Sequence, residues 1–274
     1  MPAVNPHCLQ ERRRAAPFLA GVGRYALASG DADVALETWE SGLTEESDAG
    51  DRQQLLRGVL VARAMRGEDV AEQLAEIDRL AASVSDPRFA GTFGEQAWLA
   101  FLAGRLPEAQ QAWRAEAAMN VEIATTSHAQ AARAALWDRD AVAASADLGA
   151  IDATGIHAPI TELRRQVIRA GIAALEGRTG DALALYRDVL RAWADFGLAW
   201  DQALTGIDMA TLLDPAEPEV AAAAGRARQI LVQLKAKPLI ARLDAVLARV
   251  NVVSNTPHAA SAGEVQARAI HVDR

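Results

Sequence analysis

The chain has 274 residues, of which 51% are hydrophobic and 23% are charged. Its formal net charge of −8 opposes non-specific binding to nucleic acid and to an anionic membrane surface. The single cysteine, Cys8, excludes an internal disulfide and a thiolate zinc cluster, and no apolar run reaches the roughly 18 residues that a membrane span needs.

The first 14 residues are predicted to form a separate N-terminal segment, in which Arg12–Arg14 make a short solvated basic run. The stretch that follows weakly resembles a secretory signal that ends in the Ala-Leu-Ala triplet at 26–28. Arg24 interrupts the apolar part of this stretch, which argues against a signal peptide. We therefore expect a cytoplasmic protein.

Glycines mark a repeat along the chain. Gly30, Gly67, Gly104 and Gly177 are separated by 37, 37 and 73 residues. The last interval is nearly two units, so a further turn is expected near residue 140, where Trp137–Asp140 would replace the glycine and an aspartate would cap the next helix. On both sides of each turn, apolar residues recur at steps of three and four, which is typical of helices with one buried face.

In chain order, the pattern predicts helices that pair across these turns. The expected ranges are 16–28 with 32–43, 52–65 with 70–84, 94–103 with 108–119, 128–136 with 141–151, 163–175 with 182–196, 200–213 with 218–235, and a last helix over 238–253. No alternating run of strand-forming residues competes with this assignment. The sequence therefore predicts an all-α fold.

Three units share a fuller pattern, in which an alanine follows the glycine by five residues and a large aromatic follows the alanine by four. These sets are Gly30, Ala35 and Trp39, then Gly104, Ala109 and Trp113, then Gly177, Ala182 and Tyr186. The glycine can take positive φ and end the first helix. The alanine allows the two helices to approach, and the aromatic one turn later covers the neighbouring helices.

This spacing resembles the tetratricopeptide repeat. The resemblance covers residues 15–253 and implies a right-handed superhelix of about six antiparallel helical hairpins with a closing helix. The family's small residue, seven before the turn, falls on Gly23, Ala97, Ala132 and Ala170. The unit at Gly67 departs from the pattern: Leu60 replaces the small residue, and Glu72 and Glu76 replace the alanine and the aromatic, so its second helix is expected to shift register.

The same resemblance suggests a binding groove on the concave side, which the first helix of each hairpin lines. The family's groove positions correspond to Arg24, Arg57, Trp98 and Arg133, and Arg164 lies nearby. Arginine and tryptophan suit a carboxylate-bearing or acidic peptide. The alternative is that the arginines are ordinary solvent-facing residues and that Trp98 belongs to the core.

A second resemblance lies near the C-terminus. The segments 191–197, 203–213 and 234–247, "RAWADFG", "ALTGIDMATLL" and "LKAKPLIARLDAVL", are similar to the C-terminal tail of large bacterial signalling proteins. These proteins join a nucleotide-cyclase or helix-turn-helix output domain and an ATPase module to a tetratricopeptide-like tail. The resemblance implies a sensor or scaffold role without the active domains.

No catalytic, cofactor or metal motif is present in the sequence. A phosphate-binding loop, a dinucleotide fingerprint, an appropriately spaced histidine pair and a nucleophile elbow are all missing. An enzyme would need a deep pocket with convergent groups whose pKa values are shifted. Residues 254–274 lack a firm apolar face and are expected to be disordered.

The sequence thus predicts a non-catalytic module that binds a protein or peptide partner, without nucleic acid, membrane or cofactor. The second interpretation is a separated sensor region of a nucleotide cyclase or an ATP-dependent transcription regulator. An enzyme with its active site in the groove is a third. Nothing in the sequence indicates the oligomeric state.

Overall fold

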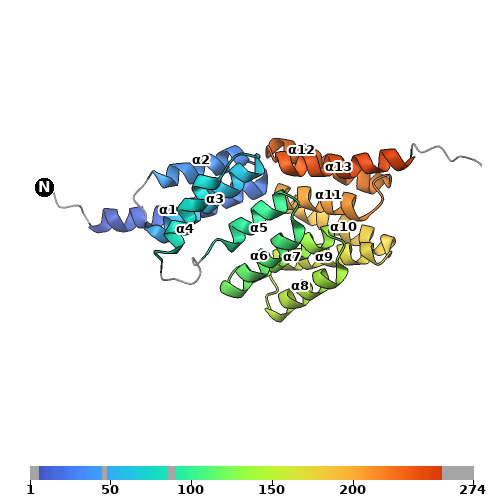
Figure 1. The fold of residues 1–274 in the computed structure, drawn as a ribbon, viewed down its shortest axis with the longest axis horizontal. Coiled ribbons are helices and arrows are strands. Elements are labelled where there is room, and N and C mark those ends of the chain that lie inside the picture. Colours follow the sequence, from blue (N-terminus) through green and yellow to red (C-terminus); the bar gives the residue numbers. More distant parts are fainter. Residues whose placement is uncertain (1–5, 45–47, 85–90, 255–274) are drawn as a thin grey trace, which may run out of the picture.

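A computed structural model describes residues 6–44, 48–84 and 91–254, and every regular element in these ranges is an α-helix. In chain order the helices are α1 (Pro6–Ser29), α2 (Ala32–Leu43), α3 (Ala49–Met65), α4 (Ala71–Ala81), α5 (Phe93–Leu102), α6 (Leu106–Met119), α7 (Ala124–Trp137), α8 (Ala141–Ala153), α9 (Pro159–Leu175), α10 (Thr179–Asp195), α11 (Ala199–Leu212), α12 (Pro218–Gln233) and α13 (Lys237–Ser254) (Figure 1). Within the described residues, α1 to α12 form six consecutive pairs and α13 follows them. The predicted all-α class is confirmed.

The glycine turns have the geometry that the spacing predicts. Gly30, Gly104 and Gly177 have φ values of 101°, 77° and 77°. The residue after each glycine donates its backbone N–H to a carbonyl five residues back, at 2.8–2.9 Å, which satisfies an orphan carbonyl at the end of the first helix. At the turn without glycine, Arg139 takes φ 62° and Asp140 accepts a capping hydrogen bond from the Ala143 N–H.

The alanine and aromatic positions of the three complete units lie in the core. The three alanines, Ala35, Ala109 and Ala182, have no exposed surface, and the three aromatics, Trp39, Trp113 and Tyr186, are at most 1% exposed. Close approach of the helices thus goes together with burial of the largest side chains, which is the packing that a stack of hairpins needs.

The Gly67 unit packs differently. Its second helix, α4, buries only Ile77, and Glu76 instead pairs with Arg52 across the hairpin at 2.7 Å. Glu76 thus lies partly in solvent, while Ile77 next to it packs against α3. The buried face of α4 is therefore shifted by one residue from the aromatic position of the other units.

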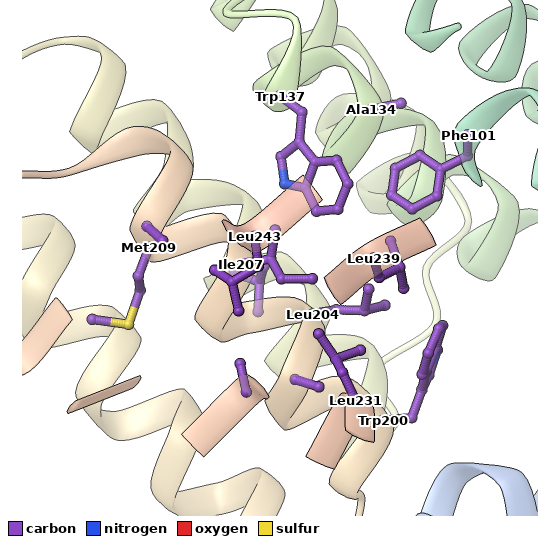
Figure 2. Close-up of a cluster of buried hydrophobic side chains, with 14 of the residues drawn as sticks. Phe101, Ala134, Trp137, Trp200, Leu204, Ile207, Met209, Leu231, Leu239 and Leu243 are labelled. Atoms are coloured by element: carbon purple, nitrogen blue, oxygen red, sulfur yellow. The ribbon is translucent and has the colours of Figure 1, made fainter. Parts of the chain in front are cut away.

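The largest part of the core gathers around α11 and α13. Figure 2 shows Leu204 and Ile207 of α11 beside Leu239 and Leu243 of α13, below Trp137 of α7. Helix α11 contacts α1, α7, α9 and α10 as well as α12 and α13. It therefore lies between α13 and the first helices of earlier pairs, α7 and α9 (Figure 1).

Contacts between the two ends of the array bring the first hairpin against the last helices. A Cβ placed on Gly30 would lie 3.2 Å from the Ala199 Cβ at the start of α11. Asp33, at the start of α2, binds Lys235 Nζ at 2.7 and 2.8 Å, although 202 residues separate them, and also binds Arg66. The first hairpin thus packs directly against the beginning of α11 and the turn before α13.

Helix α1 begins at Pro6 and crosses the expected boundary at residue 14, and α13 extends to Ser254. The rest of the predicted C-terminal tail, 255–274, lies outside the described residues. None of the helices in the described ranges combines the length and apolar character required to cross a bilayer.

Candidate binding cleft

The five predicted groove residues lie one on each of the first helices α1, α3, α5, α7 and α9, and the structure divides them into two groups. Arg24, Arg57 and Trp98 line one cleft between α1, α3, α5 and α6. Arg133 and Arg164 instead face α11 of the same chain. Arg24, Arg57 and Trp98 thus share an open cleft, whereas another helix of the same chain lies against Arg133 and Arg164.

Arg133 forms a buried ion pair. Its Nε donates to both carboxylate oxygens of Asp208 at 3.1 Å, and Trp137 Nε1 donates to Asp208 Oδ1 at 2.6 Å. Asp208 has no exposed surface. Burial raises the pKa of Asp208, while Arg133 and the Trp137 hydrogen bond oppose that rise. Arg133 is therefore a structural anchor for α11 and is closed to an external ligand.

Arg164 is largely buried on α9. Its Nη1 donates to Thr126 Oγ1 at 2.8 Å, and burial lowers the pKa of its guanidinium, which the nearby Asp201 of α11 opposes. Burial likewise raises the pKa of Asp201, and Arg164 opposes that rise. Asp201 and Asp208 are two helical turns apart, so one face of α11 presents two carboxylates to the two arginines.

Trp98 lies between the open cleft and the start of α11. Its ring centroid is 5.4 Å from that of Trp113, with an edge-on arrangement, and 6.0 Å from that of Trp200 at the start of α11. The same ring lines the open cleft. Trp98 therefore packs against the core and also lines the cleft, and its role in binding stays a prediction.

The open cleft has a volume of about 590 Å³, within the range of roughly 300–1,000 Å³ that is common for ligand sites. Leu27, Val61, Trp98 and Ile123 give it apolar walls. Its polar lining contains two arginines and three glutamates, namely Arg24, Arg57, Glu95, Glu116 and Glu122. The cleft is therefore mixed in charge, with glutamates beside the arginines and the tryptophan that the sequence singled out.

Glu95 is the most buried charged residue of this lining. It lies in the first turn of α5, is 4% exposed, and has its Oε1 3.2 Å from Arg57 Nε. Arg57 also donates to the Gly91 carbonyl at 3.0 Å. Burial raises the pKa of Glu95, and Arg57 opposes that rise. The second oxygen, Oε2, is buried and has no hydrogen-bond partner among the described residues.

Glu116 lies beside Glu95, from the neighbouring helix α6. Its Oε2 accepts a hydrogen bond from Ser127 Oγ at 2.7 Å, and burial raises its pKa. A Cβ on Gly94 would lie 2.1 Å from Glu116 Oε1, so a larger residue there would displace the carboxyl group from this position. Two carboxyl groups, one from α5 and one from α6, thus lie beside the start of α5, whose peptide dipoles favour negative charge.

Arg24 differs from Arg57 because it is exposed at the edge of the cleft and has no ionic or hydrogen-bond partner among the described residues. Arg57 is committed to Glu95 and Gly91, so Arg24 is the arginine of this lining that a ligand can reach without breaking an existing contact.

Sequence reasoning missed Glu95, Glu116 and Gly94, which give the cleft its chemistry. Glutamates are frequent on solvent-facing helices, and no motif or spacing separates these two from the others. The only local signal is the Gly94-Glu95 pair in the first turn of α5, and Glu116 has none. The described residues hold no group of three or more histidine, cysteine, aspartate or glutamate side chains that could bind a metal ion.

Comparison with known proteins finds no matching family model, no matching curated protein and no matching solved structure.

Proposed function

We propose that this chain is a non-catalytic binding module that takes a peptide segment of a protein partner in the cleft between α1, α3, α5 and α6. In this proposal the helical pairs form a right-handed, tetratricopeptide-like superhelix. Helix α11 fills the C-terminal part of its concave side, and the cleft is the part left open. The observation that carries the proposal is that Arg24, Arg57 and Trp98, from three successive first helices, line one cavity.

The chemistry of the lining supports a peptide as the ligand. Apolar walls and an aromatic ring suit side-chain burial, while Arg24 offers an uncommitted cation for a carboxylate at the edge. The occupied part of the same surface gives an internal example, because there α11 presents Asp201 and Asp208 to Arg164 and Arg133. Asp208 of α11 pairs directly with Arg133, so a helix of this chain already binds an arginine of these helices through a carboxylate.

One observation favours a second candidate, acid–base catalysis. Glu95 and Glu116 are two neighbouring carboxyl groups in a cleft, and burial raises the pKa of both, a combination found at active sites and also in structural ion pairs. We place binding first because each carboxyl group has one oxygen engaged by the protein. The lining also has no Ser, Cys, His, Lys or Tyr side chain among the described residues.

Quantitative affinity capture from native cells tests the proposed function. Arg24→Glu reverses the charge at the edge of the cleft, and Gln54→Trp fills the cleft from α3. We expect each variant to lower recovery of the specific partner at least tenfold, because each removes about 1.4 kcal/mol or more of binding free energy. The matched control is Arg191→Glu, which reverses the charge of another exposed arginine, on α10.

Recovery of the same partners at the wild-type level by both cleft variants would show that the cleft is not the binding site. Mass spectrometry of the eluted partner separates the second candidate from the first. A partner fragment or modified product that forms with the wild type and is lost with Glu95→Gln would favour catalysis over binding.

A further inference from the structure

The buried oxygen Oε2 of Glu95 is the starting point. The side chain is 5% exposed, Arg57 engages only the other oxygen, and no described group donates to Oε2. A buried polar atom without a partner costs roughly 1–3 kcal/mol. Glu95 lines a cavity of about 590 Å³, so a ligand in the cavity would lie beside this carboxyl group, and a small rotation of the side chain would bring Oε2 to a donor on that ligand.

The charges around this oxygen favour a cationic donor. The cleft lining holds two positive groups, Arg24 and Arg57, and three carboxyl groups, Glu95, Glu116 and Glu122. Arg24 is exposed at the edge, so the interior has one arginine beside the two glutamates of α5 and α6. Burial raises the pKa of Glu95 and Glu116, and an added positive charge beside them would stabilise their ionised forms.

We propose that the cleft binds the ammonium group of a lysine side chain of the partner peptide, with Glu95 Oε2 as its acceptor and Glu116 as the second negative charge beside it. This assignment rests on the proposed function. A compact ammonium suits a site with one open acceptor, whereas a planar guanidinium would need two acceptors in a fork, and the other Glu95 oxygen is already taken by Arg57.

The walls of the cleft fit the rest of a lysine side chain. Leu27, Val61 and Trp98 supply apolar surface in the same cleft as Glu95, and the four methylene groups of lysine pack favourably on such surface while the charged end reaches a polar group. An acidic residue close to that lysine in the partner would meet Arg24 at the edge. The ligand is thus a peptide with a lysine and a neighbouring carboxylate.

Titration with a defined probe tests the inference on the full chain. The probe is Nα-acetyl-lysine N-methylamide, and binding is followed by tryptophan fluorescence, because Trp98 lines the cleft. We expect saturable binding to the wild type and at least tenfold weaker binding to Glu95→Gln, which keeps the shape and removes the charge. The same probe acetylated at Nε should bind at least tenfold more weakly to the wild type.

Two further variants control this titration. Glu108→Gln changes an exposed glutamate of α6 that pairs with Arg105 outside the cleft, and it should bind the probe as the wild type does. Glu116→Gln should weaken binding because it removes the second carboxylate. If the wild type and Glu95→Gln bind the probe equally, or if the wild type does not bind it, the lysine assignment is wrong.

The outcomes for the two proposals are separable. Loss of partner recovery with Gln54→Trp, together with no probe binding to the wild type, would keep the cleft as the binding site and reject lysine as its ligand. Probe binding that depends on Glu95, together with unchanged partner recovery by Gln54→Trp, would support the ammonium site and reject the proposed function.

Discussion

Replacing Arg133 with alanine should lower the free energy of unfolding by about 3–5 kcal/mol, the usual cost of removing one partner of a buried ion pair. The substitution leaves the Asp208 carboxylate, which has no exposed surface, with the Trp137 N–H but without its guanidinium. Since Asp208 lies on α11, we expect the loss to loosen α11 from α7. Urea unfolding followed by far-ultraviolet circular dichroism measures the change.

Arg187→Ala is the matched control for this prediction. Arg187 also donates two hydrogen bonds to a carboxylate, that of Glu219, at 3.0 and 2.7 Å, but both side chains are about half exposed. An exposed pair of this kind contributes at most about 1 kcal/mol. Equal losses of stability in the two variants would contradict the view that burial makes the Arg133 pair important.

The effect of Arg133→Ala should also depend on pH. Burial raises the folded-state pKa of Asp208, and Arg133 opposes that rise, so the pKa rises further in the variant. Above the unfolded value of about 3.9, the folded variant therefore binds more protons than the unfolded chain, and its stability falls as pH increases. The difference from the wild type should be smaller near pH 4 than at pH 7.

The buried Arg133–Asp208 ion pair also determines which variants can test binding. An arginine on the row of first helices was expected to contact a partner, but a variant at Arg133 would change stability and binding together. Arg24 and Gln54 avoid this difficulty because Arg24 is exposed and Gln54 is partly exposed in the cleft.

The order of the helices follows from local features of the sequence, and for that reason it was predictable. A turn glycine, a small residue at a crossing and an aromatic one turn later each act within about ten residues. Arg139 shows the same local control, because it takes positive φ without being glycine and Asp140 caps the helix that follows. Periodicity then fixes which face of each helix is apolar.

The position of α11 between α13 and the first helices α7 and α9 was not predictable from such features. It depends on contacts between residues far apart in sequence, such as Asp33 with Lys235 and Arg133 with Asp208. Periodicity marks the apolar face of α11 but does not state that Asp201 and Asp208 lie inside. The glutamates of the cleft were not predicted for a related reason. The pKa values of Glu95 and Glu116 are raised only because neighbouring helices bury them.

Two glycines of α1 look alike in the sequence and differ in the structure. Gly21 and Gly23 both lie inside the helix. A Cβ on Gly21 would meet nothing within 4 Å, whereas a Cβ on Gly23 would lie 2.3 Å from Trp39 Nε1. Gly58 of α3 approaches the same indole ring, with a Cβ position 2.4 Å from it. The Trp39 ring therefore contacts the backbones of α1 and α3 at both glycines.

Gly23→Ala should lower the free energy of unfolding by about 1–3 kcal/mol, because the added methyl group overpacks a ring that cannot move away from it. Trp39 is 1% exposed, and its Nε1 donates to the Ala20 carbonyl at 3.3 Å, so a shift of the ring would also break this hydrogen bond. Thermal and urea unfolding of the variant measure the loss.

Gly21→Ala, two residues earlier in the same helix, should have the opposite sign. Alanine is a better helix former than glycine by about 1 kcal/mol, and the new methyl group meets open space. The two variants make the same substitution in the same helix, and they differ only in whether the Trp39 ring lies close to the added methyl group. A gain in stability for both variants would mean that Trp39 does not pack against Gly23. Gly58 approaches the same ring from α3. If the ring does not contact Gly23, the packing of Trp39 between α1 and α3 must therefore differ from the one described above.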